Sequence, residues 1–297
     1  MRLRRVTTGA LVLALLGASI AGCGVRDESA GEGVTGTEVL ADTSFLADIT
    51  QNVAGDRLSV SSLVPLGADP HSFEPTPQDA RRVAECQALV INAAGLMPVV
   101  DDLVAGAGEA DLVVIEAAAG IPGLEADPHC WLDPLSVVTY AENVASGLAL
   151  VDPAGAEVYS VNAEAYAAKL RELDSWIVAQ VETIPAERRL LVTNHESFGR
   201  FAARYGFKIV GTVFPTTTGE GSPSARQLTS LVEEIRATGA PAIFLETGSN
   251  ADLAEQVAAE AGIEVVTDLY THSLGEGACT YLDMMRWNVR LIVETLR

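Results

Sequence analysis

The chain has 297 residues, a formal net charge of −21 and only two lysines, Lys169 and Lys208. Such an acidic chain argues against a nucleic-acid partner and offers no basic patch for anionic lipids, whereas it raises the local concentration of cations. Its length is enough for one large or two modest α/β lobes.

Residues 1–22 have the pattern of a secretory signal: three arginines among the first five residues, then an apolar run too short to span a bilayer. The sequence Ile-Ala-Gly-Cys ending at Cys23 resembles a bacterial lipoprotein box, which predicts cleavage before Cys23 and lipid on its sulfur. An ordinary signal peptide is the alternative. Cleavage removes three arginines and no acid, so the charge moves from −21 to −24. We expect an extracytoplasmic protein that is anchored to the membrane as a lipoprotein.

Residues 23–36 are Gly-rich and acidic, which is typical of a flexible tether. Beyond them the cysteines are Cys86, Cys130 and Cys279. Three is an odd number, so at most one disulfide forms among them, and the sequence does not choose the pair. No Cys-x-x-Cys spacing is present, so a thiolate zinc site is not expected.

Residues 37–150 alternate short apolar runs with helical patterns. Helices are predicted at residues 45–53 and 98–105. The predicted strands are residues 37–43, 57–65, 88–95 and 111–118. This alternation predicts a parallel sheet that is covered by helices.

The same alternation returns in residues 186–297. Amphipathic segments such as residues 224–239 separate the apolar runs. The predicted strands are residues 188–196, 207–214, 241–248 and 262–270. The expected fold is therefore α/β, with two lobes that each contain a mainly parallel sheet and flanking helices.

One long helix is predicted between these lobes, within residues 151–185. Asp152 and Pro153 fit the N-cap and first helical position, and Pro185 ends the pattern. Apolar residues recur every three or four positions over about thirty residues, or roughly 45 Å. We expect one rigid helix that joins the lobes; the alternative is a long surface helix of a single domain.

The chain has four histidines: His71, His129 and His272 follow predicted strands, and His195 comes directly after the run Leu-Leu-Val-Thr-Asn of another. In parallel α/β sheets, ligands bind at the carboxyl ends of strands, where the loops converge. Two histidines come from each lobe, so we expect two imidazoles on either wall of a cleft. His71 and His129 share the prefix Ala-Asp-Pro, in which proline stiffens the approach to the ring.

Three acids lie close to this pattern in the sequence. Asp69 and Asp127 each precede a histidine by two residues and are expected to accept hydrogen bonds that orient nearby groups. Glu246 ends a predicted strand at the same edge and is a candidate to contact the site.

Four motifs carry a resemblance to a known family over essentially the whole mature chain: ADPHSFEPTPQDARRV, DPHCWLDP, VTNHESFGRFAARYG and LYTHSLGEGACTYLDMMRWNV. They resemble the zinc/manganese-type metal solute-binding lipoproteins of bacterial ABC importers. The resemblance implies a metal between two lobes, only modest lobe movement, and ligands at His71, His129 and His195. It also implies an ABC permease and its ATPase subunit as partners, and we expect a monomer.

The fourth position departs from the family pattern. Where the family has aspartate before Ser-Leu, this chain has His272, and Asp268 lies four residues earlier. The following residues align best with His272 as the fourth ligand, and Asp268 is the competing candidate. The His-rich loop of some zinc-binding members is absent from the sequence before His129.

Four neutral imidazoles suit zinc, copper(II) or nickel, whereas manganese prefers oxygen ligands. Zinc as the transported ion is therefore expected, and manganese becomes the alternative if Asp268 replaces His272. Because capture needs deprotonated imidazoles, we expect affinity to fall as the pH drops through about 6–7.

Two other classes of function remain as alternatives. A zinc hydrolase keeps three protein ligands and an open position, with Glu196 or Glu74 as a possible base, but the fourth histidine and the absence of His-Glu-x-x-His disfavour it. We therefore expect no catalytic residues. A surface adhesin with a structural metal is the other alternative, and it would unfold without the ion.

Overall fold

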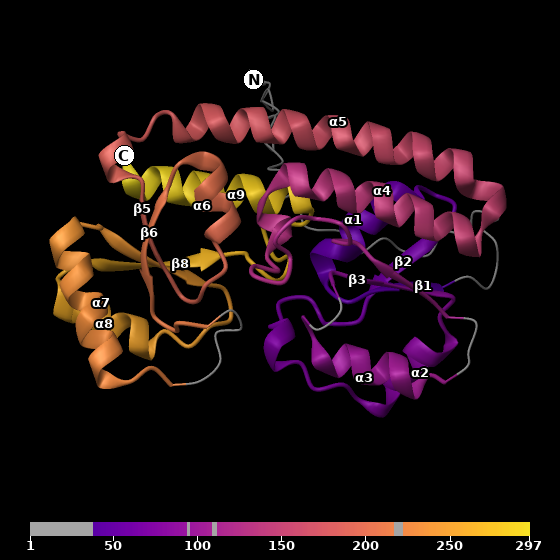
Figure 1. Cartoon of the computed structure of the whole chain (residues 1–297), viewed down its shortest axis with the longest axis horizontal. Coiled ribbons are helices and arrows are strands. Elements are labelled where there is room, and N and C mark those ends of the chain that lie inside the picture. Colours follow the sequence, from indigo (N-terminus) through magenta and orange to yellow (C-terminus); the bar gives the residue numbers. More distant parts are fainter. Residues whose placement is uncertain (1–37, 94–95, 109–111, 217–221) are drawn as a thin grey trace, which may run out of the picture.

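The computed structural model describes residues 38–93, 96–108, 112–216 and 222–297. Within these ranges the chain forms two lobes, each with a parallel sheet and flanking helices, and one long helix runs along both (Figure 1). The predicted fold class is confirmed. The predicted signal at residues 1–22 and tether at residues 23–36 lie outside the described residues.

The N-terminal sheet has the strand order β2-β1-β3-β4, and all its pairs are parallel. Its strands are β1 (Glu38–Ala41), β2 (Ser59–Ser62), β3 (Ala88–Ile91) and β4 (Val113–Glu116). Its helices are α1 (Ser44–Ala54), α2 (Pro77–Glu85), α3 (Pro98–Gly106) and α4 (Pro134–Val151).

Alternate residues of the central strands face opposite layers of this lobe, as the strand period of two requires. Leu40 and Leu89 pack in the cluster that includes residues of α2 and α3. Val39 and Ala88 pack in the cluster that includes α1 and α4. The sheet is therefore buried on both faces, which explains why these strands are continuous apolar runs.

The C-terminal sheet repeats this arrangement, with the order β6-β5-β7-β8 and parallel pairs. Its strands are β5 (Leu190–Thr193), β6 (Lys208–Thr212), β7 (Ala242–Glu246) and β8 (Glu264–Leu269). Its helices are α6 (Gly199–Tyr205), α7 (Ala225–Thr238), α8 (Asp252–Ala261) and α9 (Tyr281–Leu296). Residues of α7 and α8 cover one face of the sheet, and those of α6 and α9 belong to the cluster on the other.

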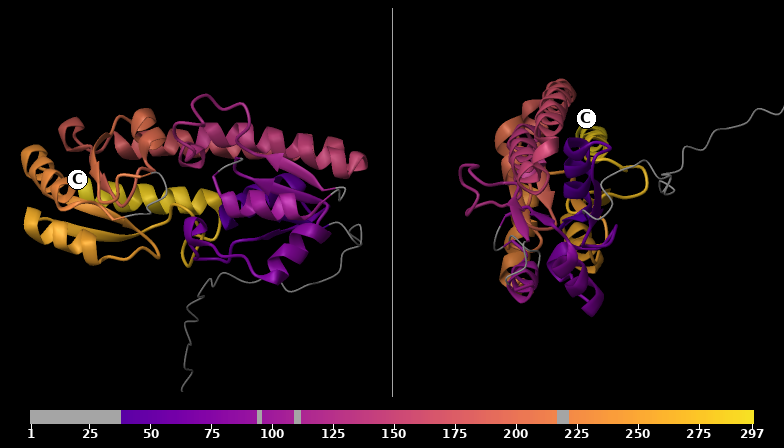
Figure 2. Two further views of the ribbon diagram at one scale, coloured as in Figure 1. Left: turned by 60° about the horizontal axis from the view of Figure 1, so that its bottom comes forward. Right: turned by 90° about the vertical axis from the view of Figure 1, so that its right-hand side faces the viewer.

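The long joining helix is α5 (Ala156–Val181), which spans both lobes (Figures 1 and 2). It has 26 residues, or about 39 Å. It is shorter than predicted because residues Pro153–Gly155 form a 3-10 turn. Asp152 does not cap this turn; its carboxylate accepts hydrogen bonds from Arg57 and from the Tyr159 hydroxyl. The division of the chain at residues 150 and 186 stays a prediction.

The largest apolar core is continuous across both lobes. It contains Trp131 and Tyr140 from the N-terminal half, Tyr166 from α5, and Phe198 and Met285 from the C-terminal half. In Figure 2 the helix α9 lies beneath α5 and reaches the N-terminal lobe, and α9 contacts both α1 and α5. The two lobes therefore share one packed interior.

Two further expectations concern the cysteines and the membrane. Cys86 and Cys130 are buried free thiols, so a disulfide between these two is not formed. Burial raises the pKa of both thiols to about 11.

Among the described residues, no helix combines the length and apolarity that crossing a bilayer requires.

Candidate metal centre

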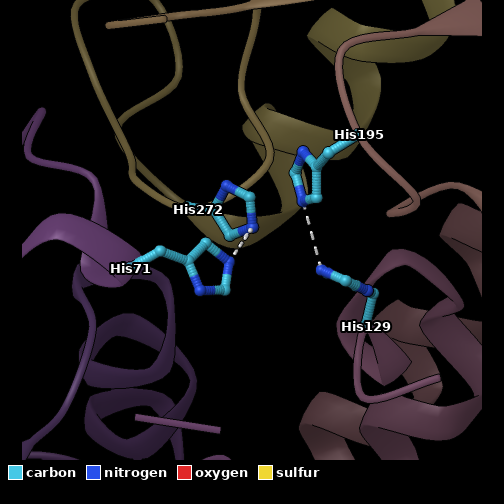
Figure 3. Close-up of side chains that lie close together, drawn as sticks. All are labelled: His71, His129, His195 and His272. Atoms are coloured by element: carbon cyan, nitrogen blue, oxygen red, sulfur yellow. Dashed lines mark hydrogen bonds between the residues drawn. The ribbon is translucent and has the colours of Figure 1, made fainter. Parts of the chain in front are cut away.

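Each histidine lies in a loop at the carboxyl end of its sheet. His71 lies in the 3-10 turn Pro70–Ser72 after β2, and His129 immediately precedes the 3-10 turn Cys130–Leu132, beyond β4. His195 and His272 follow β5 and β8 by two and three residues. Figure 3 shows the four rings pointing toward one another, two from each lobe. The four side chains therefore lie together, as the sequence predicted.

The spacing of their nitrogens fits a small ion. One candidate ligand atom from each ring lies within 4.8 Å of those from the other three. The Nε2 atoms of His71 and His272 are 3.3 Å apart, and those of His129 and His195 are 3.4 Å apart. A tetrahedron with metal–nitrogen bonds of about 2.0–2.1 Å has edges of about 3.3–3.4 Å. Two opposite edges of the cluster already have this length.

The cluster is removed from solvent. His129 is 0 % exposed, His195 1 % and His272 7 %, whereas His71 is half-buried. Burial, together with repulsion from the neighbouring rings, lowers the pKa of His71 to about 3. Burial lowers the pKa of His129 to about 4, although its hydrogen bond to Asp127 opposes the shift. These two rings are neutral at pH 7, the state in which an imidazole nitrogen binds a metal.

A buried carboxylate contacts the two imidazoles that come from the C-terminal lobe, those of His195 and His272. Glu246 is 5 % exposed; its Oε1 lies 2.7 Å from His195 Nδ1 and its Oε2 lies 3.2 Å from His272 Nδ1. The Thr271 hydroxyl donates to Oε2 at 2.6 Å. Burial alone would raise the pKa of Glu246, but its contacts with the two rings lower it well below its usual range. Glu246 therefore stays charged and turns the Nε2 atom of both rings toward the centre.

Asp127 does the same for His129. Its Oδ1 accepts the His129 backbone N–H at 3.0 Å and lies 3.0 Å from the ring Nδ1. Burial opposes ionisation, but these bonds to His129 keep the pKa of Asp127 below its ordinary value. Two carboxylates thus stand behind three imidazoles, and together they balance the charge of one divalent cation.

The other acids that the sequence singled out play smaller parts. Asp69 accepts the His71 backbone N–H at 2.9 Å. Asp268 is exposed, its carboxylate accepts from the Thr267 hydroxyl, and it is not among the clustered ligand atoms in the described part of the chain. Glu74 and Glu196 are both exposed. Of the two candidates for the fourth position, the cluster contains His272.

Trp131 forms part of the wall of the site, and the sequence analysis gave it no role there. Its ring centroid is 5.2 Å from that of His129 and 5.8 Å from that of His272. Its indole N–H donates to the Thr271 carbonyl across the lobe boundary at 2.6 Å. The proximity of Trp131 to His129 in sequence was the only available signal.

Comparison with known proteins supports this reading of the fold and of the protein class. The family model described as zinc-uptake complex component A, periplasmic, matches residues 39–295. The manganese-binding lipoprotein MntA of Halalkalibacterium halodurans is 36% identical over 293 residues, covering 96% of both chains. The manganese ABC transporter substrate-binding lipoprotein PsaA of Streptococcus pneumoniae is 31% identical over 278 residues, 87% of this chain and 88% of the relative.

Solved structures agree with the fold. The Cd-bound periplasmic metal binding protein of Candidatus Liberibacter asiaticus superposes with a TM-score of 0.78 at 29% identity, over 88% of this chain and 100% of that one. The periplasmic zinc binding protein TroA of Treponema pallidum gives a TM-score of 0.81 at 24% identity, over 88% and 99% of the two chains, and shows the shared fold.

The resemblance carried by the sequence motifs is therefore confirmed, and with it the expectation of a receptor rather than an enzyme. The chain belongs to the zinc-uptake complex component A family, the periplasmic metal-binding receptors of ABC importers.

Proposed function

We propose that this protein is a zinc receptor, and that His71, His129, His195 and His272 bind the ion between the two lobes. The observation that carries the proposal is the meeting of four imidazoles from four separate loops, with two opposite nitrogen pairs at 3.3 and 3.4 Å. An all-nitrogen tetrahedral set suits zinc, whereas manganese prefers oxygen ligands and higher coordination. The cargo ion is the substrate of this receptor.

Manganese is the second candidate, because relatives with 36% and 31% identity are named for it. Glu246 and Asp127 are carboxylates that contact the rings, and both do so at Nδ1, on the side away from the centre. A manganese site would need one of them to turn inward, which would leave a buried imidazole without its partner.

The experiment is competitive metal binding to purified, metal-stripped protein, followed by anomalous diffraction at the zinc edge. We expect zinc to be retained with one metal per chain and to displace manganese. A protein that keeps manganese in the presence of equimolar zinc would overturn the assignment.

We further propose that lipid on Cys23 anchors the receptor outside the cytoplasmic membrane, where it works as a monomer. Its partners would be an ABC permease with its ATPase, to which it delivers the ion. The names of the relatives, which are lipoproteins of metal ABC transporters, support this role. Mass spectrometry of the membrane fraction tests the anchor; loss of the lipid mass in a Cys23→Ala variant is the expected result.

A further inference from the structure

A cavity of about 260 Å³ opens beside the histidine cluster. His71, His195 and His272 line it, whereas His129 does not and is 0 % exposed. The cavity therefore reaches the cluster from one side, and His129 lies at the far side. His71, the least buried of the four rings, belongs to the cavity wall.

The remaining wall of this cavity is mostly polar, and among the described residues that line it there is no lysine or arginine. Its other lining residues are Asp69, Ser72, Asn194, Phe214, Glu246, Gly248, Ser249 and Asn250. The exposed carboxylate of Asp69 is held at the start of the His71 turn. Asn194 is 7 % exposed and donates to the Ser249 hydroxyl, while its Oδ1 accepts no hydrogen bond from the described residues. Such walls suit a cation that still carries water.

A second cavity, of about 290 Å³, lies near the other side of the site. Asp127 lines it, but none of the four histidines does. Because Asp127 contacts the outer nitrogen of His129, these two side chains stand between this cavity and the centre. The Arg200 guanidinium also donates to the Asp127 carbonyl across the lobe boundary. This second cavity offers no path to the ligand nitrogens.

We propose that the first cavity, lined by Asp69 and Asn194, is the path by which a hydrated divalent cation reaches and leaves the cluster. The proposal rests on the function proposed above. Asp69 attracts the ion, and the imidazoles of His71, His195 and His272 replace its water ligands before His129 does. Each exchange forms one metal–nitrogen bond, breaks one metal–oxygen bond and returns a neutral water molecule to the cavity.

Blocking the path tests the proposal, because an obstruction changes rates without changing the end states. Ser72→Trp and Asn250→Trp each place a large side chain at an exposed position of the wall, one from each lobe. We expect each to slow zinc association and dissociation by the same factor and to leave Kd unchanged. Ala126→Trp, at the exposed lining of the second cavity, is the matched control and should leave both rates as in the wild type.

The charge of Asp69 is tested separately. Asp69→Asn keeps an oxygen that can accept the His71 N–H but removes the carboxylate charge. Association should slow about two- to fivefold at low salt, and the difference should vanish at high salt. Asp102→Asn removes one charge from an exposed position on α3 outside the cavity and should have no such effect.

Stopped-flow fluorescence provides the rates, with Trp131 as the reporter beside His129 and His272. Equilibrium competition with a zinc chelator provides Kd. If wild-type protein binds no zinc at equilibrium, the proposed function fails. If it binds zinc but Ser72→Trp and Asn250→Trp both leave the rates unchanged, or Ala126→Trp slows them, the proposed path fails and the receptor function stands.

Discussion

At the scale of single residues, the orientation of the imidazoles depends on carboxylates. Glu246 contacts His195 and His272 with its two oxygens, and Asp127 contacts His129. The contact of Asp127 with His129 is a hydrogen bond on Nδ1, which fixes the tautomer of that ring and leaves its Nε2 lone pair for a ligand. Three of the four rings therefore lie against a carboxylate before an ion arrives.

Replacing Glu246 tests this role. Glu246→Gln keeps the shape but removes the charge and puts an amide N–H₂ against one ring nitrogen. We expect zinc affinity to fall about 10- to 100-fold, the range typical for partners of metal ligands. Competition titration measures it, and Glu196→Gln, at an exposed position, is the control. Equal zinc affinity in both variants would show that Glu246 does not orient the metal-binding imidazoles.

The two shifted imidazoles give a prediction for pH. The ordinary histidine pKa is 6.5, but burial lowers that of His71 to about 3 and that of His129 to about 4. In the metal-free protein, NMR titration should find His129 neutral down to about pH 4 and His71 neutral to a lower pH. The fall of affinity through pH 6–7 expected from free imidazoles thus does not apply to these rings.

The same shifts set the sign of their effect on stability. As the pH falls below 6.5, the unfolded chain binds protons at these positions before the folded one does. The metal-free protein should therefore lose stability from these two groups between about pH 6.5 and their folded values. Urea unfolding at pH 7 and pH 5 measures the loss, and a stability contribution from these rings that rises toward pH 5 would contradict the burial argument.

At the scale of elements, close packing places α4 against its sheet. A Cβ added at Gly147 of α4 would lie 2.4 Å from Ile115 Cγ1 in β4, and within 3 Å of two other side-chain atoms of Ile115. Ile115 is itself buried, and its branched side chain has little room to turn. The glycine therefore allows this helix to approach the strand.

Substitution at Gly147 should reverse the usual preference of helices for alanine. Gly147→Ala is expected to destabilise the protein by about 1–3 kcal/mol through overpacking. Gly106→Ala, at the end of α3 with no atom near its added Cβ, should instead stabilise by about 0.4–1 kcal/mol. Urea denaturation compares the two, and a stabilising effect at both positions would refute the packing argument.

At the scale of the whole molecule, one core joins the lobes independently of any ion. Trp131, Tyr166 and Met285 come from distant parts of the chain and belong to the same buried cluster. The Tyr281 hydroxyl donates to the Trp131 carbonyl at 2.6 Å and ties α9 to the turn that directly follows His129. The metal-free receptor should therefore stay folded, unlike a protein with a structural zinc.

Metal removal tests that expectation. With chelator the far-ultraviolet circular dichroism should be unchanged and thermal unfolding should stay cooperative. Free zinc at a hundred times Kd should add about 2.7 kcal/mol of stability, or roughly 5–10 °C in Tm. Unfolding on chelation would favour a structural role for the ion.

The sequence by itself determined the strands and several helices, although α2 and α4 were not among the helices that it predicted. Apolar runs such as those around Leu89 and Ile243 are buried on both sides, and strand periodicity with intervening helices leads directly to parallel sheets. It also placed all four histidines after strands, because chain order fixes where each strand ends. The predicted start of α5 was wrong by one turn. Asp152 contacts Arg57, which is distant in sequence, and Tyr159, which lies beyond the first turn, and a local capping pattern shows neither contact.

Only the tertiary structure decided between His272 and Asp268 as members of the cluster. Both lie in the same short segment, and the choice depends on which side chain points inward when β8 ends; Asp268 has a positive φ of 74° and is exposed. The sequence also did not predict that Glu246 contacts both His195 and His272, because these residues lie 51 and 26 positions away from it in the chain. Local patterns specify elements, whereas a binding site is set by how those elements pack.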